Sequence, residues 1–322
     1  MAPVITRIVG VAGKVLVGLG VLILLFAAYQ LWGTGVLESH SQAQLRAKFD
    51  SELPPGAALK ARRLSVGVKA PPPPQNGPPQ VAPTVAAPAT GQPVGIIDIP
   101  SIGVNQVVVE GVTTADLRTG PGHYPGTPLP GESGNASIAG HRTTYAHPFY
   151  DLNAVAPGDR IVVTTAQGIF VYSADTLSTV SPTDVAVVAP TSGAELTLTT
   201  CTPRYSASTR LVLHATLVQS TFYTAPPPAQ ATTTTTTTTT RPPAVAHRVR
   251  RAAGDLAGKG GGVDWFPVVA WGLAAAVVAV AARLAAARTR LGRLAYLPGA
   301  VVLLVVLFFF FTAVSPLLPA SF

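Results

Sequence analysis

The chain has 322 residues, of which 48% are hydrophobic and only 11% are charged, and its formal net charge is +8. About a quarter of the residues in an ordinary soluble domain carry a charge, so this composition excludes a chain that is a soluble domain throughout. The basic residues gather beside apolar runs and not in patches interleaved with aromatic residues. This pattern argues against nucleic-acid binding and favours a membrane protein.

Residues 1–32 predict a cytoplasmic N-terminus and a first transmembrane helix. Their apolar stretch runs from about Ile8 to Trp32, which exceeds the ~20 residues that a helix needs to cross a bilayer. A cleaved signal peptide is the alternative, but the apolar part is long for one and no small-x-small cleavage site follows it. We therefore expect an uncleaved anchor.

Two further apolar stretches, residues 265–282 and 296–318, predict transmembrane helices joined by an arginine-rich loop over 283–295. Short loops rich in arginine stay in the cytoplasm, so the second helix runs inward and the third outward. The basic N-terminus also belongs inside. Both signals predict a multi-pass protein of the cell membrane, with residues 33–264 on the extracytoplasmic side.

Two segments have the composition of linkers. Residues 33–93 predict a polar helix over Leu37–Leu53, followed by a spacer rich in proline and alanine, which favours extended polyproline conformations. Residues 224–264 contain the threonine run Thr232–Thr240 and a glycine-rich stretch. Such a composition is typical of a stalk and of O-linked glycosylation.

Residues 94–223 differ in character and predict one small, mainly β domain. Segments rich in Val, Ile, Thr and aromatic residues indicate strands. These segments are Gln106–Glu110, Arg160–Thr165, Gly168–Ala174, Glu195–Thr200 and Arg210–Val218. Turns rich in glycine and proline separate them, and helical periodicity is weak apart from a short turn near Pro148–Val155. We expect a compact β-barrel.

Cys201 is the one cysteine of the chain, so it forms neither an internal disulfide nor a cysteine-based metal site. It closes a predicted strand in which alternation places the thiol on the polar face, opposite Leu196 and Leu198. An unpaired thiol in an exported domain is open to oxidation, which argues for a chemical use. The alternative is a small buried hydrophobic residue, the commonest fate of a free cysteine.

A nucleophilic thiol needs a basic or cationic neighbour. Among the six histidines, His141 is the first candidate, because a short apolar run meets a polar loop there. His123 is the second, and His214 is interpreted as a strand residue with a local partner. No histidine pair has metal-ligand spacing and no carboxylates accompany the histidines, so we predict no metal and no cofactor.

Arg210 lies at the entry to the strand that follows Cys201. A strand–loop–strand connection can return its guanidinium to the thiol, where it would stabilise a thiolate and an oxyanion. Arg204 can do the same from the loop, and either arginine can instead be solvated. The residues alone leave these readings open.

Several segments of the central domain, taken in order, resemble the sortase family, and most closely its class E branch from actinobacteria. The segments are Ile99–Gly103, Val107–Val112, Gly120–Thr127, Ala139–Tyr145, Val180–Asp184 and Leu196–Cys201, with Arg210 downstream. The resemblance covers nearly all of residues 94–223 and none of the linkers or apolar helices. It implies a mainly β fold, an eight-stranded sortase barrel with short helices, flanked here by transmembrane helices.

The resemblance also implies a reaction. Cys201 would attack the Thr–Gly bond of an LPxTG- or LAxTG-type sorting signal near the C-terminus of an exported protein, and an amine of a peptidoglycan precursor would resolve the thioacyl enzyme. His141 would be the acid/base, and Arg210 would hold the substrate and the oxyanion. The residues that would shape the substrate groove are Tyr124, Tyr145 and Thr200.

The chain departs from the class E pattern at Thr202, where histidine is common, and in its two C-terminal apolar helices. A C-terminal membrane segment is more typical of the pilin-polymerising class C sortases, but the first linker lacks the Asp-Pro-aromatic motif of the class C lid. The alternatives are a class C-like pilin polymerase, a membrane-tethered cysteine peptidase and a non-catalytic wall-spanning stalk protein.

Overall fold

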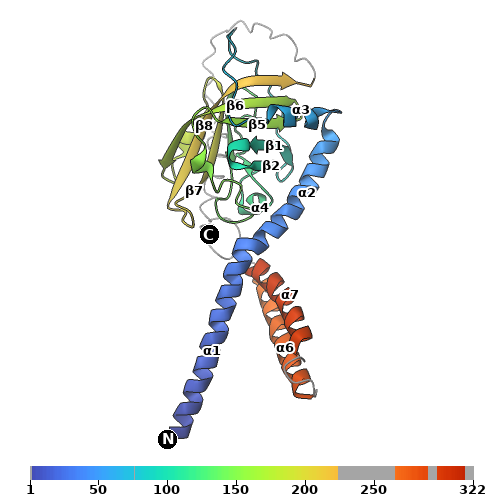
Figure 1. Ribbon diagram of the computed structural model, residues 1–322, viewed down its shortest axis with the longest axis vertical. Helices are drawn as coiled ribbons and strands as arrows, with labels where there is room; N and C mark the ends of the chain where they lie inside the picture. The colour runs from blue at the N-terminus through green and yellow to red at the C-terminus, as the bar shows by residue number, and fades with distance from the viewer. Residues whose placement is uncertain (1, 76, 224–264, 289–295, 316–322) are drawn as a thin grey trace. The chain divides into compact units, whose positions relative to one another are not determined.

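The computed structural model describes residues 2–75, 77–223, 265–288 and 296–315 (Figure 1). The chain divides into two compact units, one made of Met1–Thr34 with Gly261–Pro319 and the other of Gly35–Gly260 with Ala320–Phe322. The predicted linker over 224–264 and most of the predicted loop over 283–295 lie outside the described residues.

The first unit is helical. Its elements are α1 (Ala2–Ala28), the π-helical turn η1 (Tyr29–Gly33), α6 (Phe266–Arg288) and α7 (Tyr296–Val314). The rings of Trp271 on α6 and Phe309 on α7 stack with their centroids 4.9 Å apart. Tyr29 of η1 donates a hydrogen bond from its hydroxyl to Thr312 Oγ1 on α7 at 3.2 Å. The stacked rings join α6 to α7, and the hydrogen bond joins the N-terminal helical segment to α7.

One helical segment among the described residues, Phe266–Ala285, is long and apolar enough to cross a membrane. Leu16–Ala28 and Pro298–Val314 form shorter apolar helical stretches. The predicted spans thus fall on α1, α6 and α7, and the topology with three crossings stays a prediction.

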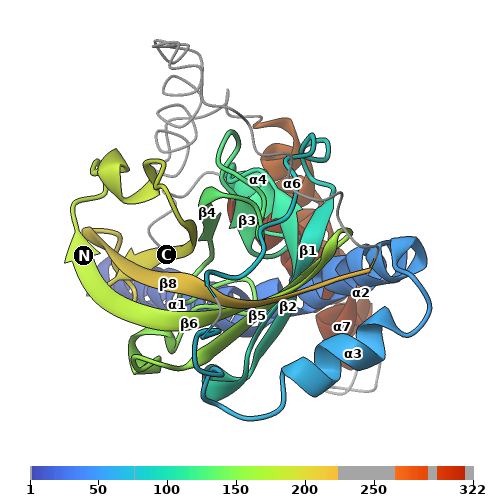
Figure 2. The same cartoon turned by 90° about the horizontal axis from the view of Figure 1, so that it is seen from above.

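The second unit is built on a closed barrel of eight strands (Figure 2). The strands are β1 (Pro93–Ile99), β2 (Val104–Glu110), β3 (Gly122–His123), β4 (Gly134–Ala139), β5 (Arg160–Thr165), β6 (Gly168–Val180), β7 (Ala194–Thr202) and β8 (Thr209–Phe222). Their order around the barrel is β1-β2-β3-β4-β7-β8-β6-β5. The pairs β2–β3 and β4–β7 are parallel, and the remaining pairs are antiparallel.

Four short helical elements lie in the connections between the strands. They are η2 (Pro100–Ile102), α4 (Thr114–Leu117), η3 (Leu152–Ala154) and η4 (Val185–Val188). The predicted mainly β fold, an eight-stranded barrel with short helices, is confirmed.

The predicted strands lie on β2, β5, β6, β7 and β8, and β5 has the predicted bounds. The predicted end of β6 at Ala174 was wrong, because the strand continues to Val180 through an exposed segment without an apolar pattern. Pairing with β8 as far as Arg210 holds that extension in place. The strand β4 was not predicted, because its residues Gly134–Ala139 are mostly small and polar, and its structure comes from pairing with β3 and β7.

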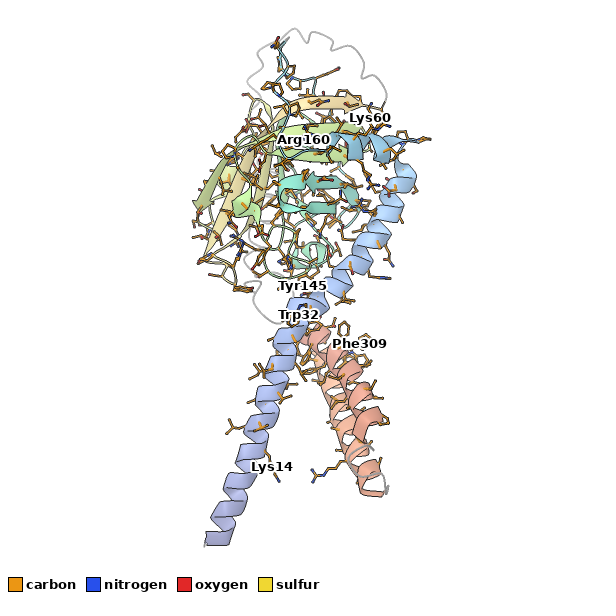
Figure 3. The ribbon with its side chains drawn as sticks, viewed as in Figure 1. Lys14, Trp32, Lys60, Tyr145, Arg160 and Phe309 are labelled. Carbon is orange, nitrogen blue, oxygen red and sulfur yellow. The ribbon has the colours of Figure 1, made fainter. Side chains whose placement is uncertain are left out.

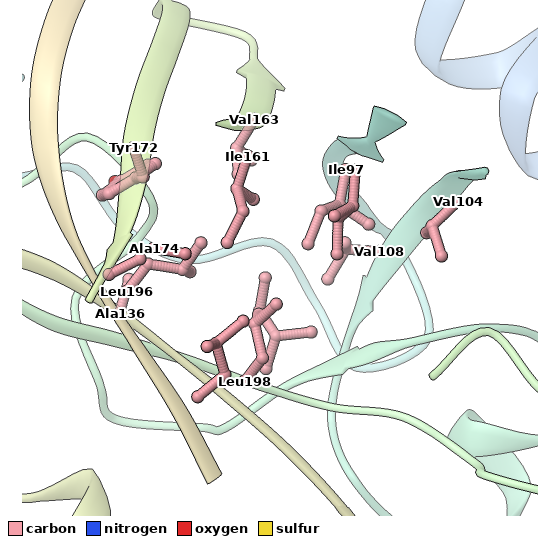
Figure 4. Packing of buried hydrophobic residues seen from close by; sticks show 14 of the residues in the cluster. Ile97, Val104, Val108, Ala136, Ile161, Val163, Tyr172, Ala174, Leu196 and Leu198 are labelled. Carbon is pink, nitrogen blue, oxygen red and sulfur yellow. The ribbon is translucent and has the colours of Figure 1, made fainter. Parts of the chain in front are cut away.

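The barrel interior is filled by branched and aromatic side chains from alternate strand positions (Figure 4). Fully buried examples are Ile97, Ile161, Tyr172, Leu196 and Leu198. The alternation predicted for β7 is therefore observed, since Leu196 and Leu198 point into this core. Burial of each such side chain contributes on the order of 1.5–3 kcal/mol.

The helices α2 (Thr34–Glu52) and α3 (Ala57–Leu64) precede the barrel, and α2 matches the predicted polar helix. Gln42 on α2 binds β2 as a neighbouring strand would, because its Oε1 accepts from the Val107 N–H at 2.7 Å and its Nε2 donates to the Val107 carbonyl at 3.0 Å. Arg160 on β5 fixes the end of α3 by donating to the Leu64 carbonyl at 2.6 Å (Figure 3).

Residues 54–93 are more than the extended spacer that their composition predicts. Beyond α3, the N–H of Ala70 donates to the Gly158 carbonyl at 2.9 Å, and the N–H of Ala82 donates to the Gly131 carbonyl at 2.7 Å. Ala82 is also part of the barrel core. Local composition could not show this docking, because the backbone partners lie far along the chain.

We expect Gln42→Ala to loosen α2 from the barrel, because it removes the side-chain partner of the Val107 N–H and carbonyl. Each polar group left unpaired in a buried place costs about 1–3 kcal/mol. Thermal unfolding of the detergent-solubilised chain, followed by circular dichroism, would measure the loss. The matched control is Gln44→Ala, since Gln44 is exposed and its side chain is hydrogen-bonded to His40 on the same helix. Equal stability of the two variants would contradict this account of the docking.

Candidate active site

The strand β7 lies between β4 and β8, and this arrangement brings three of the predicted residues together. Cys201 is near the end of β7 and pairs directly with Arg210 at the start of β8. On the other side, Ala139 at the end of β4 pairs with Thr199 of β7, and His141 follows two residues later. The thiol is therefore flanked by His141 and Arg210.

A pocket lies at this place. The residues that line it are Thr114, Leu117, Ala139, Gly140, His141, Thr199, Thr200, Cys201 and Arg210. Cys201 is a free, partly buried thiol that lines the pocket and does not lie in the barrel core. This position favours the chemical reading of Cys201 over the reading as a small buried hydrophobic residue.

The pocket sets the charge states of its two titratable groups. Burial raises the pKa of the Cys201 thiol, while the positive charges of Arg210 and Arg142 act against that rise. Burial lowers the pKa of His141 to about 4, and the charge of Arg118 acts in the same direction. At neutral pH the imidazole is uncharged and the thiol is protonated, so a thiolate forms only with help from its cationic neighbours.

The two candidate arginines have different surroundings. The Arg210 Nη1 donates to the carbonyls of Ala207 and Thr209 at 3.0 and 3.2 Å, which holds the guanidinium beside the pocket. Arg204 instead forms an ion pair with Asp151 at 2.7 Å and covers the ring of Tyr150. Of these two arginines, Arg210 lines the pocket and Arg204 does not.

The structure also separates the histidines. His123 is fully buried, with Nδ1 at 2.7 Å from Glu110 Oε2 and Nε2 at 2.9 Å from the Pro128 carbonyl, and its role is structural. His214 on β8 lies 3.0 Å from Thr197 Oγ1, which is the local partner that we predicted. The Nε2 of His141 is buried and has no hydrogen-bond partner among the described residues.

The loop that carries His141 is held against β7 and the core. Gly140 is needed there, because a Cβ atom at this position would lie 2.6 Å from Phe149 Cδ2. Its carbonyl accepts a hydrogen bond from Thr200 Oγ1 at 2.7 Å. Thr200, predicted to bind substrate, thus lines the pocket while its hydroxyl holds the loop of the histidine.

The two tyrosines predicted to shape the groove lie close to the site, but the residues that line the described pocket include neither of them. Tyr124 is buried, and its hydroxyl lies 3.0 Å from Thr199 Oγ1. The Tyr145 ring lies 5.2 Å from the His141 ring, centroid to centroid. Tyr145, Ala146 and His147 have φ values of 50°, 52° and 41°, a left-handed run that non-glycine residues adopt only where the surrounding structure imposes it.

Sequence reasoning missed Arg142, which joins the histidine loop to the nucleophile strand. This side chain is only 6% exposed. Its Nη1 donates to the Cys201 carbonyl at 3.2 Å, its Nε to the Tyr150 carbonyl at 3.3 Å and its Nη2 to Asn153 Oδ1 at 2.6 Å. Its place directly after His141 was the only local signal, and that signal cannot tell a buried arginine from a solvated one.

Part of the chain is similar in sequence to known proteins of one family. Residues 97–218 match the family described as Sortase domain. Sortase SrtE1 of Streptomyces coelicolor is 33% identical over 223 residues, which cover 64% of this chain and 56% of SrtE1. The same organism's sortase SrtE2 is 26% identical over 228 residues, which cover 66% of this chain and 83% of SrtE2.

Among solved structures, sortase E from Streptomyces avermitilis is 37% identical, with a TM-score of 0.40, and the match covers 44% of this chain and 98% of that structure. The chain thus spans only about half the length of SrtE1, 56%, and nearly all of the solved sortase E.

Alkylation of Cys201 by iodoacetamide should rise with pH along a curve set by the thiol pKa, since the thiolate is the reactive form. Arg210→Ala removes a charge that lowers this pKa, so the curve should move to higher pH and the rate at pH 7 should fall. Arg204→Ala is the control, because Arg204 is bound to Asp151, and its curve should match that of the unchanged protein. An unshifted curve for Arg210→Ala would show that Arg210 does not act on the thiol.

Thr200→Val should destabilise the chain by about 1–3 kcal/mol, because it leaves the buried Gly140 carbonyl unpaired, whereas Thr200→Ser keeps the hydroxyl and should cost less. Thermal unfolding of the two variants would measure the difference. A Thr200→Val variant that keeps its stability but binds substrate more weakly would assign the hydroxyl to the substrate instead.

Proposed function

Since this chain belongs to the sortase family, we propose that it is a membrane-anchored cysteine transpeptidase that cuts a sorting signal and transfers the protein to an amine. The observation that carries the proposal is the arrangement of Cys201 between His141 and Arg210 around one pocket. These are the groups that acyl transfer needs: a nucleophile, an acid/base and a cation for the oxyanion.

In the first step, Cys201 Sγ attacks the carbonyl carbon of the threonine in the Thr–Gly bond. The thiol proton passes to the neutral imidazole of His141, whose low pKa leaves it uncharged and able to accept a proton at neutral pH. Arg210 faces the negative charge that develops on the carbonyl oxygen. The imidazolium then protonates the departing glycine amine, and a thioester to Cys201 remains.

In the second step, an incoming amine attacks the thioester carbonyl, and His141 takes a proton from it. The thiolate leaves, and a new amide bond joins the substrate protein to the amine. We propose that the substrates are exported proteins with an LAxTG- or LPxTG-type signal, and that the acceptor is an amine of a peptidoglycan precursor. The similarity to two Streptomyces class E sortases supports this choice.

We place the enzyme in the cell membrane as a multi-pass protein, with its catalytic domain on the extracytoplasmic side. The segment Phe266–Ala285 has the length and composition of a membrane span, and α7 and η1 contact each other through Tyr29. The arginine-rich loop at 283–295 and the basic N-terminus set the orientation.

The membrane-tethered peptidase remains the second candidate, because its site would hold the same residues and water would replace the amine. The class C-like pilin polymerase differs only in the protein that supplies the amine. The non-catalytic stalk would need an inert thiol in the core, and Cys201 lines the pocket instead.

The test mixes the full-length chain with quenched peptides that contain LAxTG or LPxTG, with and without an added amine. We expect cleavage coupled to ligation of the amine, and loss of both in Cys201→Ala. His141→Ala should lower turnover by about 10²–10⁴-fold and Arg210→Ala by about 10²–10³-fold.

The control variant is His147→Ala, which removes an exposed histidine of the same loop and should leave turnover near that of the unchanged protein. Mass spectrometry of the products separates the two leading candidates. A hydrolysed product that persists at saturating amine would establish the peptidase, and cleavage by Cys201→Ala would remove the cysteine mechanism altogether.

A further inference from the structure

Arg118 is a cation close to the active site to which the proposed mechanism gives no role. It is the C-cap of α4, a helix that lines the pocket with Thr114 and Leu117. Its guanidinium carbon lies 5.7 Å from the centroid of the Tyr145 ring, and that ring lies beside His141. The charge of Arg118 also contributes to the low pKa of His141.

The Arg118 side chain is half-buried and unpaired. Its Nε is buried without a hydrogen-bond partner, and no described residue forms an ion pair with it. The nearest acid in sequence, Asp116, is committed to the capping box of α4, since its Oδ2 accepts from the N–H of Thr113 at 3.0 Å and from its hydroxyl at 2.7 Å. A half-buried guanidinium without an anion is a site that an anionic ligand can fill.

The order of the strands places this cation on a particular side of the nucleophile. The helix α4 lies between β2 and β3, His141 follows β4, Cys201 ends β7 and Arg210 begins β8. Along the order β2-β3-β4-β7-β8 the groups therefore follow one another as Arg118, His141, Cys201 and Arg210. Arg210 serves the oxyanion on one side of the thiol, and Arg118 lies beyond the base on the other side.

That side matters in the second step of the proposed reaction, when His141 takes a proton from the acceptor amine. The imidazolium formed there is repelled by Arg118, which already disfavours the charged form of His141. A carboxylate bound to Arg118 would cancel this repulsion, and it would do so only while the acceptor is present. The acceptor would then make its own base stronger on binding.

We propose that Arg118 binds a carboxylate that the acceptor carries next to its nucleophilic amine. The acceptor class is thus an amino acid or a diamino acid residue with an unblocked carboxylate, and an amine without one is a poorer substrate. This inference rests on the proposed transpeptidase function and narrows its second substrate.

The test uses the full-length chain, a quenched sorting peptide and two amine probes, glycine and glycinamide, supplied at equal concentrations of unprotonated amine. The quantity measured is the ratio of kcat/KM for transfer to glycine over that for transfer to glycinamide. In Arg118→Gln we expect this ratio to fall by about tenfold, the size of one charged hydrogen bond. Arg118→Lys, which keeps the charge, should retain most of the ratio.

The matched control is Arg46→Gln on α2, because Arg46 is bound by Asn105 Oδ1 at 2.6 Å and its loss should leave the ratio unchanged. A ratio in Arg118→Gln equal to that of the unchanged chain overturns the inference. The proposed function would still stand in that case, because the chain would still transfer the peptide to an amine. An unchanged chain that cleaves the peptide but transfers it to neither amine overturns the proposed function, and this inference with it. Because the ratio compares two amines on one protein, a general loss of folded enzyme does not move it.

Discussion

The strand β7 is paired on both edges, parallel to β4 and antiparallel to β8, and the functional geometry follows from that pairing. One edge sets the distance from Cys201 to the loop of His141, and the other places Arg210 opposite the thiol. Parallel strands end at the same side of a sheet, so the loop after β4 opens where β7 ends. A shift of one residue in either register would turn the thiol toward the core face.

Burial shifts the pKa values of both reactive side chains of the site toward their uncharged forms. It disfavours the thiolate of Cys201 and the imidazolium of His141 alike, so the resting pair is neutral. Arg210 and Arg142 act on the thiol side, and Arg142 also joins the loop of the histidine to the Cys201 carbonyl. Arg118 acts on the histidine side in the opposite sense, since it makes the imidazolium harder to form. A carboxylate on the acceptor would offset the charge of Arg118 only in the second step, when His141 must take a proton from the acceptor amine.

Within the helical unit, the N-terminal and C-terminal helices pack together. Tyr29 and its contacts with Phe308, Phe311 and Thr312 join the N-terminal helix to α7. The helices that precede and follow the catalytic domain in sequence therefore meet within one unit, although more than two hundred residues separate them along the chain.

The sequence by itself determined the elements whose signal is local. Alternation in β7 put Cys201 on the face opposite Leu196 and Leu198, and the short connection to Arg210 implied a return to the thiol. The apolar runs predicted the helices α1, α6 and α7. The ordered motifs predicted the family and its barrel fold.

Only the tertiary structure decided the roles that depend on distant partners. In the folded chain, Arg204 forms an ion pair with Asp151, and His123 is buried against Glu110. The Thr200 hydroxyl donates to the carbonyl of Gly140, 60 residues away. The tertiary structure also drew β4 into the sheet and docked residues 54–93 on the barrel. The physical reason is that a charged or polar side chain carries the same local signal whether it is solvated or buried, and only the folded chain supplies the partner that distinguishes the two.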